Sequence, residues 1–408
     1  MTAAPTAPAG QDARIIALIG TGHFLSHFYV LTLPPLFLLW REEFGVSFAE
    51  LGLAVALMSG TTALLQTPVG FLVDKHGARP FLVGGTLLMA LSISAMAFAP
   101  GIWAIWLLAI LSGVGNSVIH PADYAILAGS IDKSRMGRAF ALHTFTGNLG
   151  FALAPPVVAV LAAGLGWRGA LLLVGLLGVP VVAAILVQSR ILRDQPKAPK
   201  TGPEPSGREI LLSRPILLFF GFFMLSSMAG SGIQAFVITV LGQLWGTPVA
   251  VASMVLTGYM VGATAGTLVG GWIVDATKRN LIGFVVVLTM VAIGMILALG
   301  LLPIPDLLLP VVGLVGGLAL GASRTPRDVM LKDAAPPGQV GKVFGFVSSG
   351  LPLGGAITPV PLGFVIDMGY PQLVLPVVAA LLAASLLCAG SAQAEARSRR
   401  RVAPAPAE

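Results

Sequence analysis

The chain contains a series of long apolar runs separated by short polar or turn-forming segments. A membrane-spanning helix needs about 20 consecutive, predominantly apolar residues. Runs of about this length can be placed twelve times, with boundaries that are loose by several residues. They cover residues 15–39, 48–71, 81–99, 102–129, 138–163, 169–190, 215–244, 248–273, 281–301, 306–331, 341–366 and 371–392. We therefore predict an all-α integral membrane protein with twelve transmembrane helices.

The composition supports this fold class and excludes others. Only 10% of the 408 residues are charged and 56% are hydrophobic, whereas an average soluble domain has roughly 25% charged residues. Such a chain cannot cover a soluble surface with polar groups, and it is too apolar to be disordered. A β-barrel is excluded because barrel strands are alternating segments of about 10 residues. The single cysteine, Cys388, permits neither an internal disulfide nor a paired-cysteine metal site.

The distribution of positive charge predicts the orientation in the membrane. Of the 24 lysines and arginines, 20 fall in the two tails or in loops on the same side as the tails. Only Arg41 and Arg168 fall on the opposite side, and Arg324 and Arg327 lie within a run. Because cytoplasmic loops carry an excess of lysine and arginine, we predict that both termini are cytoplasmic. The net charge of +7 then requires no nucleic-acid partner.

The chain divides into two halves that resemble each other. Residues 191–213 are the only long polar segment inside the chain, and their proline, lysine and glycine are typical of a linker. We expect a cytoplasmic tail at 1–14, a six-helix half at 15–190, a cytoplasmic linker at 191–213, a second six-helix half at 214–392 and a cytoplasmic tail at 393–408. The segments at 70–74 and 121–123 recur at 271–275 and 326–328. Two pseudo-symmetric parallel halves are thus predicted.

One loop motif carries a family resemblance. The segment Gly-Phe-Leu-Val-Asp-Lys-His-Gly-Ala-Arg at 70–79 resembles the pattern G-x-x-x-D-R-x-G-R-R of the major facilitator superfamily, with departures at Lys75 and Ala78. A degenerate copy contains Gly271, Asp275 and Arg279. The resemblance covers essentially the whole chain and implies the major facilitator fold.

Two further regions resemble the fosmidomycin-resistance group of exporters within that superfamily. One is Gly-His-Phe-Leu-Ser-His-Phe-Tyr at 22–29, and the other combines residues 115–121 with Gly-Asn-Leu-Gly-Phe at 147–151. The resemblance implies a protein of the bacterial inner membrane that exports small molecules and confers antibiotic resistance. Pro155 is followed by Pro156, which differs from the span-five pattern of many drug–proton antiporters.

The superfamily resemblance also implies a cytoplasmic latch between the halves. Asp74 would face the helix that starts near Lys342, and Asp275 would face the helix that starts near Arg138, because a helix N-terminus favours a carboxylate. The alternative is that Asp74 is an ordinary solvated loop charge. The predicted latch residues are Gly70, Asp74, Lys75, Gly77, Arg79, Asp275, Arg279, Arg138 and Lys342.

Arg324 and Arg327 are the most informative charges within a run. An arginine at a helix centre costs about 2.5–3.5 kcal/mol on insertion scales. Their spacing puts both guanidinium groups on one helical face, which cannot face lipid. They either bind an anionic substrate through forked hydrogen bonds to carboxylate or phosphonate, or they pair with Asp328 and Asp123 and hold helices together.

Other polar residues within the runs are candidates for proton coupling or substrate contact. Asp123 with His120 one turn earlier is suited to a proton relay, with Asp328 as its counterpart; Asp123 could instead pair with an arginine. The predicted cavity-lining residues are His23, His27, His120, Asn148 and Gln234. His143 is interpreted as packed. Because a histidine pair alone is a weak metal signal, we predict no metal site and no cofactor.

The sequence contains no nucleotide-binding motif and no nucleophile–base constellation, so we predict that the protein is not an enzyme and is driven by a gradient. We predict a monomeric secondary transporter of a small organic anion or phosphonate-like drug, working by proton-coupled efflux. Proton-coupled uptake of a small carboxylate is the alternative within the same fold. A non-transporting sensor or scaffold is the alternative of another class, and an additional folded domain would favour it.

Overall fold

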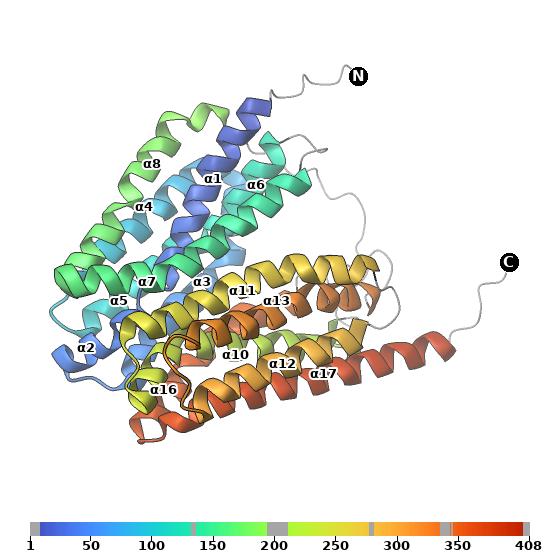
Figure 1. Cartoon of the computed structure of the whole chain (residues 1–408). Helices are drawn as coiled ribbons and strands as arrows, with labels where there is room; N and C mark the ends of the chain where they lie inside the picture. The colour runs from blue at the N-terminus through green and yellow to red at the C-terminus, as the bar shows by residue number, and fades with distance from the viewer. Residues whose placement is uncertain are drawn as a thin grey trace, which may run out of the picture. The chain divides into compact units, whose positions relative to one another are not determined.

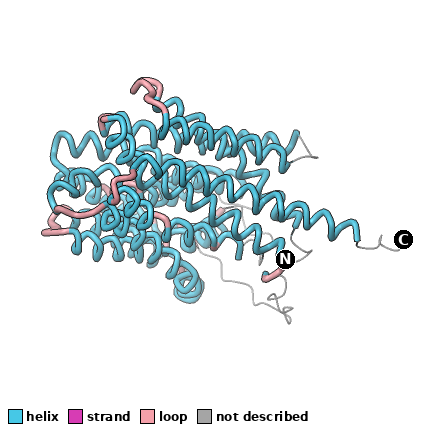
Figure 2. Tube along the Cα trace, turned by 90° about the horizontal axis from the view of Figure 1, so that it is seen from below, coloured by secondary structure: helices cyan, strands magenta, loops and turns pink. Residues whose placement is uncertain are grey.

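The computed structural model describes residues 9–131, 136–193, 211–276, 281–334, 343 and 346–402. These residues form helices joined by short turns and loops, and no strand occurs among them (Figure 1, Figure 2). The chain divides into two compact units, residues 1–200 and residues 201–408. The predicted all-α class is confirmed for the described part of the chain.

The described residues of the first unit form eight α-helices. They are α1 (Ala9–Val30), α2 (Phe37–Phe44), α3 (Phe48–His76), α4 (Ala78–Met96), α5 (Ile102–Ser117), α6 (Ile119–Ser130), α7 (Met136–Leu176) and α8 (Gly178–Val187). Within this unit α1 packs against α7, and α5 packs against both α3 and α4. The packing of α1 on α7 and α6 positions the polar groups of this half.

The second unit also consists of α-helices among its described residues. They are α10 (Arg214–Trp245), α11 (Val249–Ala276), α12 (Leu281–Leu301), α13 (Leu309–Ala334), α15 (Gly350–Ile357), α16 (Pro359–Asp367) and α17 (Val374–Val402). The most extensive packing in this unit is between α11 and α13, and α10 packs along α17. Helix α13 carries both of the arginines that the sequence places within a run.

Ten helical segments among the described residues are long and apolar enough to cross a membrane. The longest, Leu142–Val187, covers two of the predicted spans. Gly166 lies inside it with φ 70° and ψ 164°, a conformation that favours glycine and that breaks the helix where the sequence predicts a turn. Helix α13 is not among the ten, because Arg324 and several glycines lower its mean hydropathy. Counting the longest segment as two spans and adding α13 gives twelve, so the ten segments are consistent with the predicted number.

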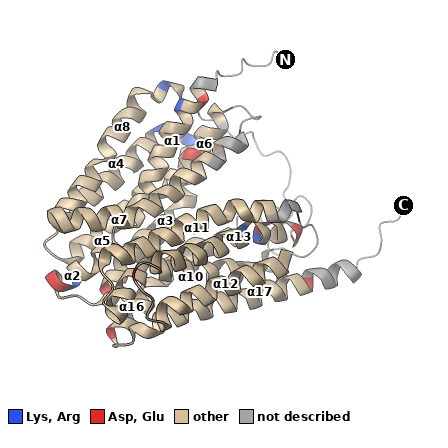
Figure 3. Cartoon of the chain, in the orientation of Figure 1, with Lys and Arg blue, Asp and Glu red and all other residues tan. Residues whose placement is uncertain are grey.

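The surface of each unit is largely apolar between the helix ends. Large side chains such as Leu64 (77% exposed) and Trp272 (71% exposed) are mostly exposed. The described charged residues lie mostly near helix ends, and long middle stretches carry none (Figure 3). Soluble proteins rarely expose contiguous apolar surfaces of this extent, so these faces are suited to contact with lipid.

Helices α11 and α13 approach each other so closely that only glycine fits at the contact. Glycines occur at every fourth position: Gly258, Gly262, Gly266 and Gly270 on α11, and Gly313, Gly317 and Gly321 on α13. A Cβ added at Gly262 would lie 2.1 Å from the carbonyl oxygen of Leu314, and one at Gly317 would lie 2.0 Å from that of Tyr259. Small residues allow such backbone contact between membrane helices, and here they fix the position of α13.

The equivalent apolar run of the first unit is interrupted. Helix α5 ends at Ser117 and α6 begins at Ile119, with Val118 between them. Pro121 in the first turn of α6 lacks the N–H that would bond to the carbonyl of Ser117, which accounts for the break. Helix α13 continues through its own proline, Pro326. The predicted repeat is therefore imperfect in the two helices that carry its acidic residues.

A polar cluster joins α2 to the part of α7 that follows Gly166. The indole nitrogen of Trp167 and the guanidinium group of Arg168 both donate to the carboxylate of Glu43. The Arg168–Glu43 pair is partly solvent-exposed, at 45% and 38% of the two side chains. The tryptophans at 40 and 167 also contact each other edge to face. Amphipathic aromatic rings next to arginines suit a membrane interface.

Candidate functional site

Four histidines from three helices of the first unit lie together. His23 and His27 come from α1, His120 from α6 and His143 from α7. The ring centroid of His23 lies 4.3 Å from that of His27, 5.1 Å from that of His120 and 3.7 Å from that of His143. The structure therefore brings together the three histidines that the sequence predicts as cavity residues, and it adds His143.

Close packing of α7 on α1 places these rings. A Cβ added at Gly147 would lie 2.4 Å from Cε1 of His23 and 2.8 Å from Cε1 of His27. A Cβ at Gly150 would lie 2.2 Å from the carbonyl oxygen of Phe24. The glycines of the motif at 147–151 are thus required by the approach of two helices. The motif and the histidines of α1 form one structural unit.

The orientation of the His23 ring is fixed by its own hydrogen bond. Its Nδ1 lies 2.7 Å from the backbone carbonyl oxygen of His143, and since a carbonyl only accepts, Nδ1 carries the proton. The remaining nitrogen, Nε2, then presents a lone pair. This nitrogen is buried and has no hydrogen-bond partner, as are Nδ1 of His27 and Nδ1 of His120. An unsatisfied buried polar atom costs about 1–3 kcal/mol, so this concentration of such atoms is unusual.

Asp123 on α6 is paired with His143. Its Oδ2 lies 2.9 Å from Nε2 of His143, and the side chains are 0% and 2% exposed. The second carboxylate oxygen, Oδ1, is buried without a partner. The predicted partners of Asp123 were His120 or an arginine, whereas its observed partner within this unit is His143. A proton shared by the two groups can sit on either one, which suits proton transfer.

The second unit presents one unpaired arginine and one paired arginine on α13. Arg324 is exposed, and it has no hydrogen bond or ion pair within the described part of the chain. Nη2 of Arg327 lies 2.9 Å from Oδ1 of Asp328, and its guanidinium carbon lies 3.9 Å from the ring centroid of Phe223. Asp328 is 44% exposed and Arg327 is 12% exposed at the side chain. Arg327 thus has the structural pairing that the sequence left as its alternative.

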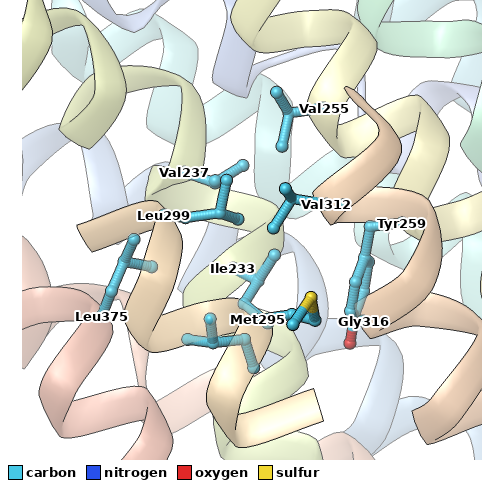
Figure 4. A pocket seen from close by; sticks show the side chains of 11 residues that line it. Ile233, Val237, Val255, Tyr259, Met295, Leu299, Val312, Gly316 and Leu375 are labelled. Atoms are coloured by element: carbon cyan, nitrogen blue, oxygen red, sulfur yellow. The ribbon is translucent and has the colours of Figure 1, made fainter. Parts of the chain in front are cut away.

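A pocket in the second unit is lined by α10, α11, α12, α13 and α17, and one of its lining residues, Tyr259, interacts electrostatically with Arg324. Its lining is apolar except for the side chain of Tyr259 (Figure 4). Hydrocarbon side chains such as Ile233, Met295 and Leu375 line the rest. An anion would lose its hydration there and would gain only the Tyr259 hydroxyl as a side-chain donor. This pocket therefore does not suit a charged ligand.

The remaining predicted site residues form two groups. The structure describes the burial of some of them, and it does not describe the side chains of the others. Asn148 on α7 and Gln234 on α10 are half-buried. In the predicted latch, Gly77 joins α3 to α4 with φ 88°, which favours glycine; Lys75 is exposed and Arg79 is half-buried. The side chains of Asp74, Arg138 and Asp275, and residues Arg279 and Lys342, lie outside the described part of the structure. The latch stays a prediction.

Comparison with known proteins adds a family assignment. Residues 19–243 and 222–407 match the Major Facilitator Superfamily. The chain is 27% identical to the fosmidomycin resistance protein of Escherichia coli over 391 residues, which cover 93% of each protein. It is 27% identical to a multi-drug resistance efflux pump of Streptococcus pneumoniae over 354 residues, covering 83% of this chain and 86% of the pump.

A similarity in fold extends to a solved structure. A bacterial homolog of the human lysosomal transporter Spinster, in an inward-facing and unoccupied conformation, superposes with a TM-score of 0.79. The alignment covers 98% of this chain and 100% of the other, at 14% sequence identity. At this identity the likeness supports the fold alone.

Proposed function

Because this chain belongs to the major facilitator superfamily, a family of transporters, we propose that it is a secondary active transporter of a small organic anion or a phosphonate-like drug. It moves this substrate across the bacterial inner membrane by alternating access, as a monomer with both termini in the cytoplasm. Proton-coupled efflux is the proposed mode.

The observation that carries the anionic substrate class is the unpaired guanidinium group of Arg324. A cation on a membrane-embedded helix is costly unless it contacts water, a counter-ion or a ligand. Its neighbour Arg327 pairs with Asp328 and packs on the ring of Phe223. Arg324 has no hydrogen bond or ion pair among the described residues, and its interaction with Tyr259 and Asp328 is electrostatic, without direct pairing. A passing carboxylate or phosphonate supplies the missing anion through forked hydrogen bonds. The proposal therefore rests on Arg324 more than on Arg327.

The pair of Asp123 and His143 supports proton coupling. Both side chains are buried and lie 2.9 Å apart, so a proton can move between them with little change in geometry. An intramembrane carboxylate next to an imidazole is a recurring arrangement in proton-driven transporters. In this proposal Asp123 gains and loses the proton as the carrier opens to either side, and His143 positions it. His120 and Asp328 remain further candidates for that role.

The similarity to the fosmidomycin resistance protein and to a multi-drug efflux pump supports outward transport. Proton-coupled uptake of a small carboxylate remains the second candidate, because the same residues serve either direction and the gradients decide between them. The experiment therefore uses proteoliposomes, in which both gradients are set by the experimenter.

The test begins with a thermal-shift screen of carboxylates, simple phosphonates and fosmidomycin against the purified carrier. The best ligand is then radiolabelled and its transport measured in proteoliposomes. We expect Arg324→Ala to abolish binding and transport, and Arg324→Lys to retain part of both, because lysine keeps the charge but loses the fork. Arg193→Ala is the matched control, since Arg193 is exposed outside the helical spans.

Two results would contradict the proposal. Transport by Arg324→Ala at the wild-type rate would remove the anion site. A screen in which only cations or neutral compounds stabilise the carrier would exclude the substrate class, while leaving the transporter fold intact.

A further inference from the structure

We propose that His23, His27 and His120 form a binding site for a divalent transition-metal ion of the zinc class. One ring nitrogen from each of the three residues lies within 4.8 Å of those of the other two. Histidine is the commonest metal ligand among side chains, and three imidazoles are a recurring ligand set for zinc. This inference is independent of the transported substrate.

The unsatisfied nitrogens are the observation that points to a metal ion. His23 Nε2, His27 Nδ1 and His120 Nδ1 are all buried without a hydrogen-bond partner. In a purely structural cluster, each nitrogen would be expected to bond to a neighbouring donor or acceptor. A metal ion bound by these three nitrogens would satisfy all of them at once.

The tautomer of His23 is the one that metal binding requires. Its Nδ1 donates to the carbonyl oxygen of His143 at 2.7 Å, which leaves the lone pair on Nε2. Metal-bound histidines nearly always donate their other N–H to a carbonyl or carboxylate, which fixes the ring and raises its basicity. The stacking of His143 on His23, with centroids 3.7 Å apart and planes 7° apart, holds the ring further.

The geometry needs only small side-chain rotations. Zn–N bonds of about 2.0–2.1 Å in a tetrahedral site place the ligand nitrogens about 3.3 Å apart. His23 is buried, whereas His27 and His120 are half-buried. The three nitrogens must move closer together to bind one ion. Three protein ligands leave a fourth position for water or an anion.

The positions of the three histidines in the sequence do not by themselves indicate a metal site. His23 and His27 are one helical turn apart on α1, but His120 comes from a helix almost a hundred residues later. The break between α5 and α6 at Val118 lies just before His120. Only the folded structure unites the three ligands.

The test uses the full-length protein in detergent, produced without a polyhistidine tag and stripped with a chelator. Titration with Co²⁺ should give one saturable site with visible ligand-field absorption, and Zn²⁺ should displace the Co²⁺. In His23→Gln, His27→Gln and His120→Gln we expect affinity to fall by about 100-fold or more, beyond the 10–100-fold typical of outer-shell changes. His76→Gln is the matched control, because His76 is exposed on α3 and should bind like the wild type.

A second variant keeps every ligand and disturbs only the geometry. Gly147→Ala places a methyl group 2.4 Å from the ring of His23 and should weaken Co²⁺ binding. Gly164→Ala, whose added Cβ has nothing within 4 Å, should not. Wild-type protein without a saturable Co²⁺ site, or histidine variants that bind as tightly as the wild type, would overturn the proposal. Because metal binding is read without transport, its failure is distinguishable from failure of the proposed function.

Discussion

Replacing His143 should leave the buried carboxylate of Asp123 without its hydrogen-bond partner. In His143→Ala the side chain of Asp123, which is 0% exposed, loses its only hydrogen-bond partner among the described residues. Oδ1 of Asp123 already lacks one. The variant therefore leaves both carboxylate oxygens of a buried side chain without a hydrogen-bond partner, which lowers the stability of the folded state.

The magnitude follows from the geometry of the pair. A hydrogen bond of 2.9 Å between buried groups, one of them ionisable, contributes about 1.5–3 kcal/mol. Removing one partner of a buried charged pair costs more, about 3–5 kcal/mol, because the other charge stays buried and uncompensated. We therefore expect His143→Ala to lower the free energy of unfolding by about 3–5 kcal/mol. Asp123→Asn, which keeps a hydrogen-bonding group, should cost less.

A double-mutant cycle measures the interaction free energy between Asp123 and His143 and gives its sign. Adding Asp123→Ala to His143→Ala removes the stranded carboxylate, so the double variant should be more stable than His143→Ala alone. Unfolding is followed by tryptophan fluorescence in detergent at several denaturant concentrations, with His76→Ala as the exposed control. Additive losses in the double variant would refute the argument that the two groups act as a buried pair.

Three further predictions concern other parts of the molecule. Gly317→Ala should destabilise the protein by about 1–3 kcal/mol by overpacking, because its Cβ would lie 2.0 Å from a backbone oxygen of α11, whereas Gly294→Ala has nothing within 4 Å and serves as the control; equal unfolding midpoints would contradict this. Glu43→Gln should cost only about 0.2–1 kcal/mol, because its pair with Arg168 is partly exposed, and the difference from wild type should shrink in high salt; a larger loss would show a role beyond a surface pair. Asp74→Asn should increase labelling of a cysteine introduced on the cytoplasmic side, if the latch exists; unchanged labelling would reject the latch.

The fold could be predicted because membrane insertion imposes a simple rule. Each span needs about 20 apolar residues, so the runs and their turns are visible in the sequence. The turn at Gly166, with φ 70°, coincides with a predicted break between two spans. Helix α13 is the exception, because Arg324 and several glycines lower its mean hydropathy, and three of those glycines lie at its close contact with α11.

The arrangement of the site was only partly predictable. The histidines of α1 were recognised, but His143 was interpreted as packed, although it is the partner of Asp123. A signal was present: His143, Gly147 and Gly150 share one face of α7 at helical spacing, and the two glycines mark the face that contacts α1. The sequence leaves the pairing of Arg327 with Asp328 as one of two alternatives, because neighbouring helical residues point in different directions. The structure shows that the long side chain of Arg327 does reach Asp328.

The most direct test of proton-coupled anion transport is to record proton movement while the substrate moves. Wild-type carrier is reconstituted in proteoliposomes that contain a pH-sensitive dye, and an outward gradient of the transported anion is imposed at equal internal and external pH. We expect protons to move opposite to the anion in the wild type, and anion movement without proton movement in Asp123→Asn. Anion transport by the wild type with no change in internal pH would contradict the account.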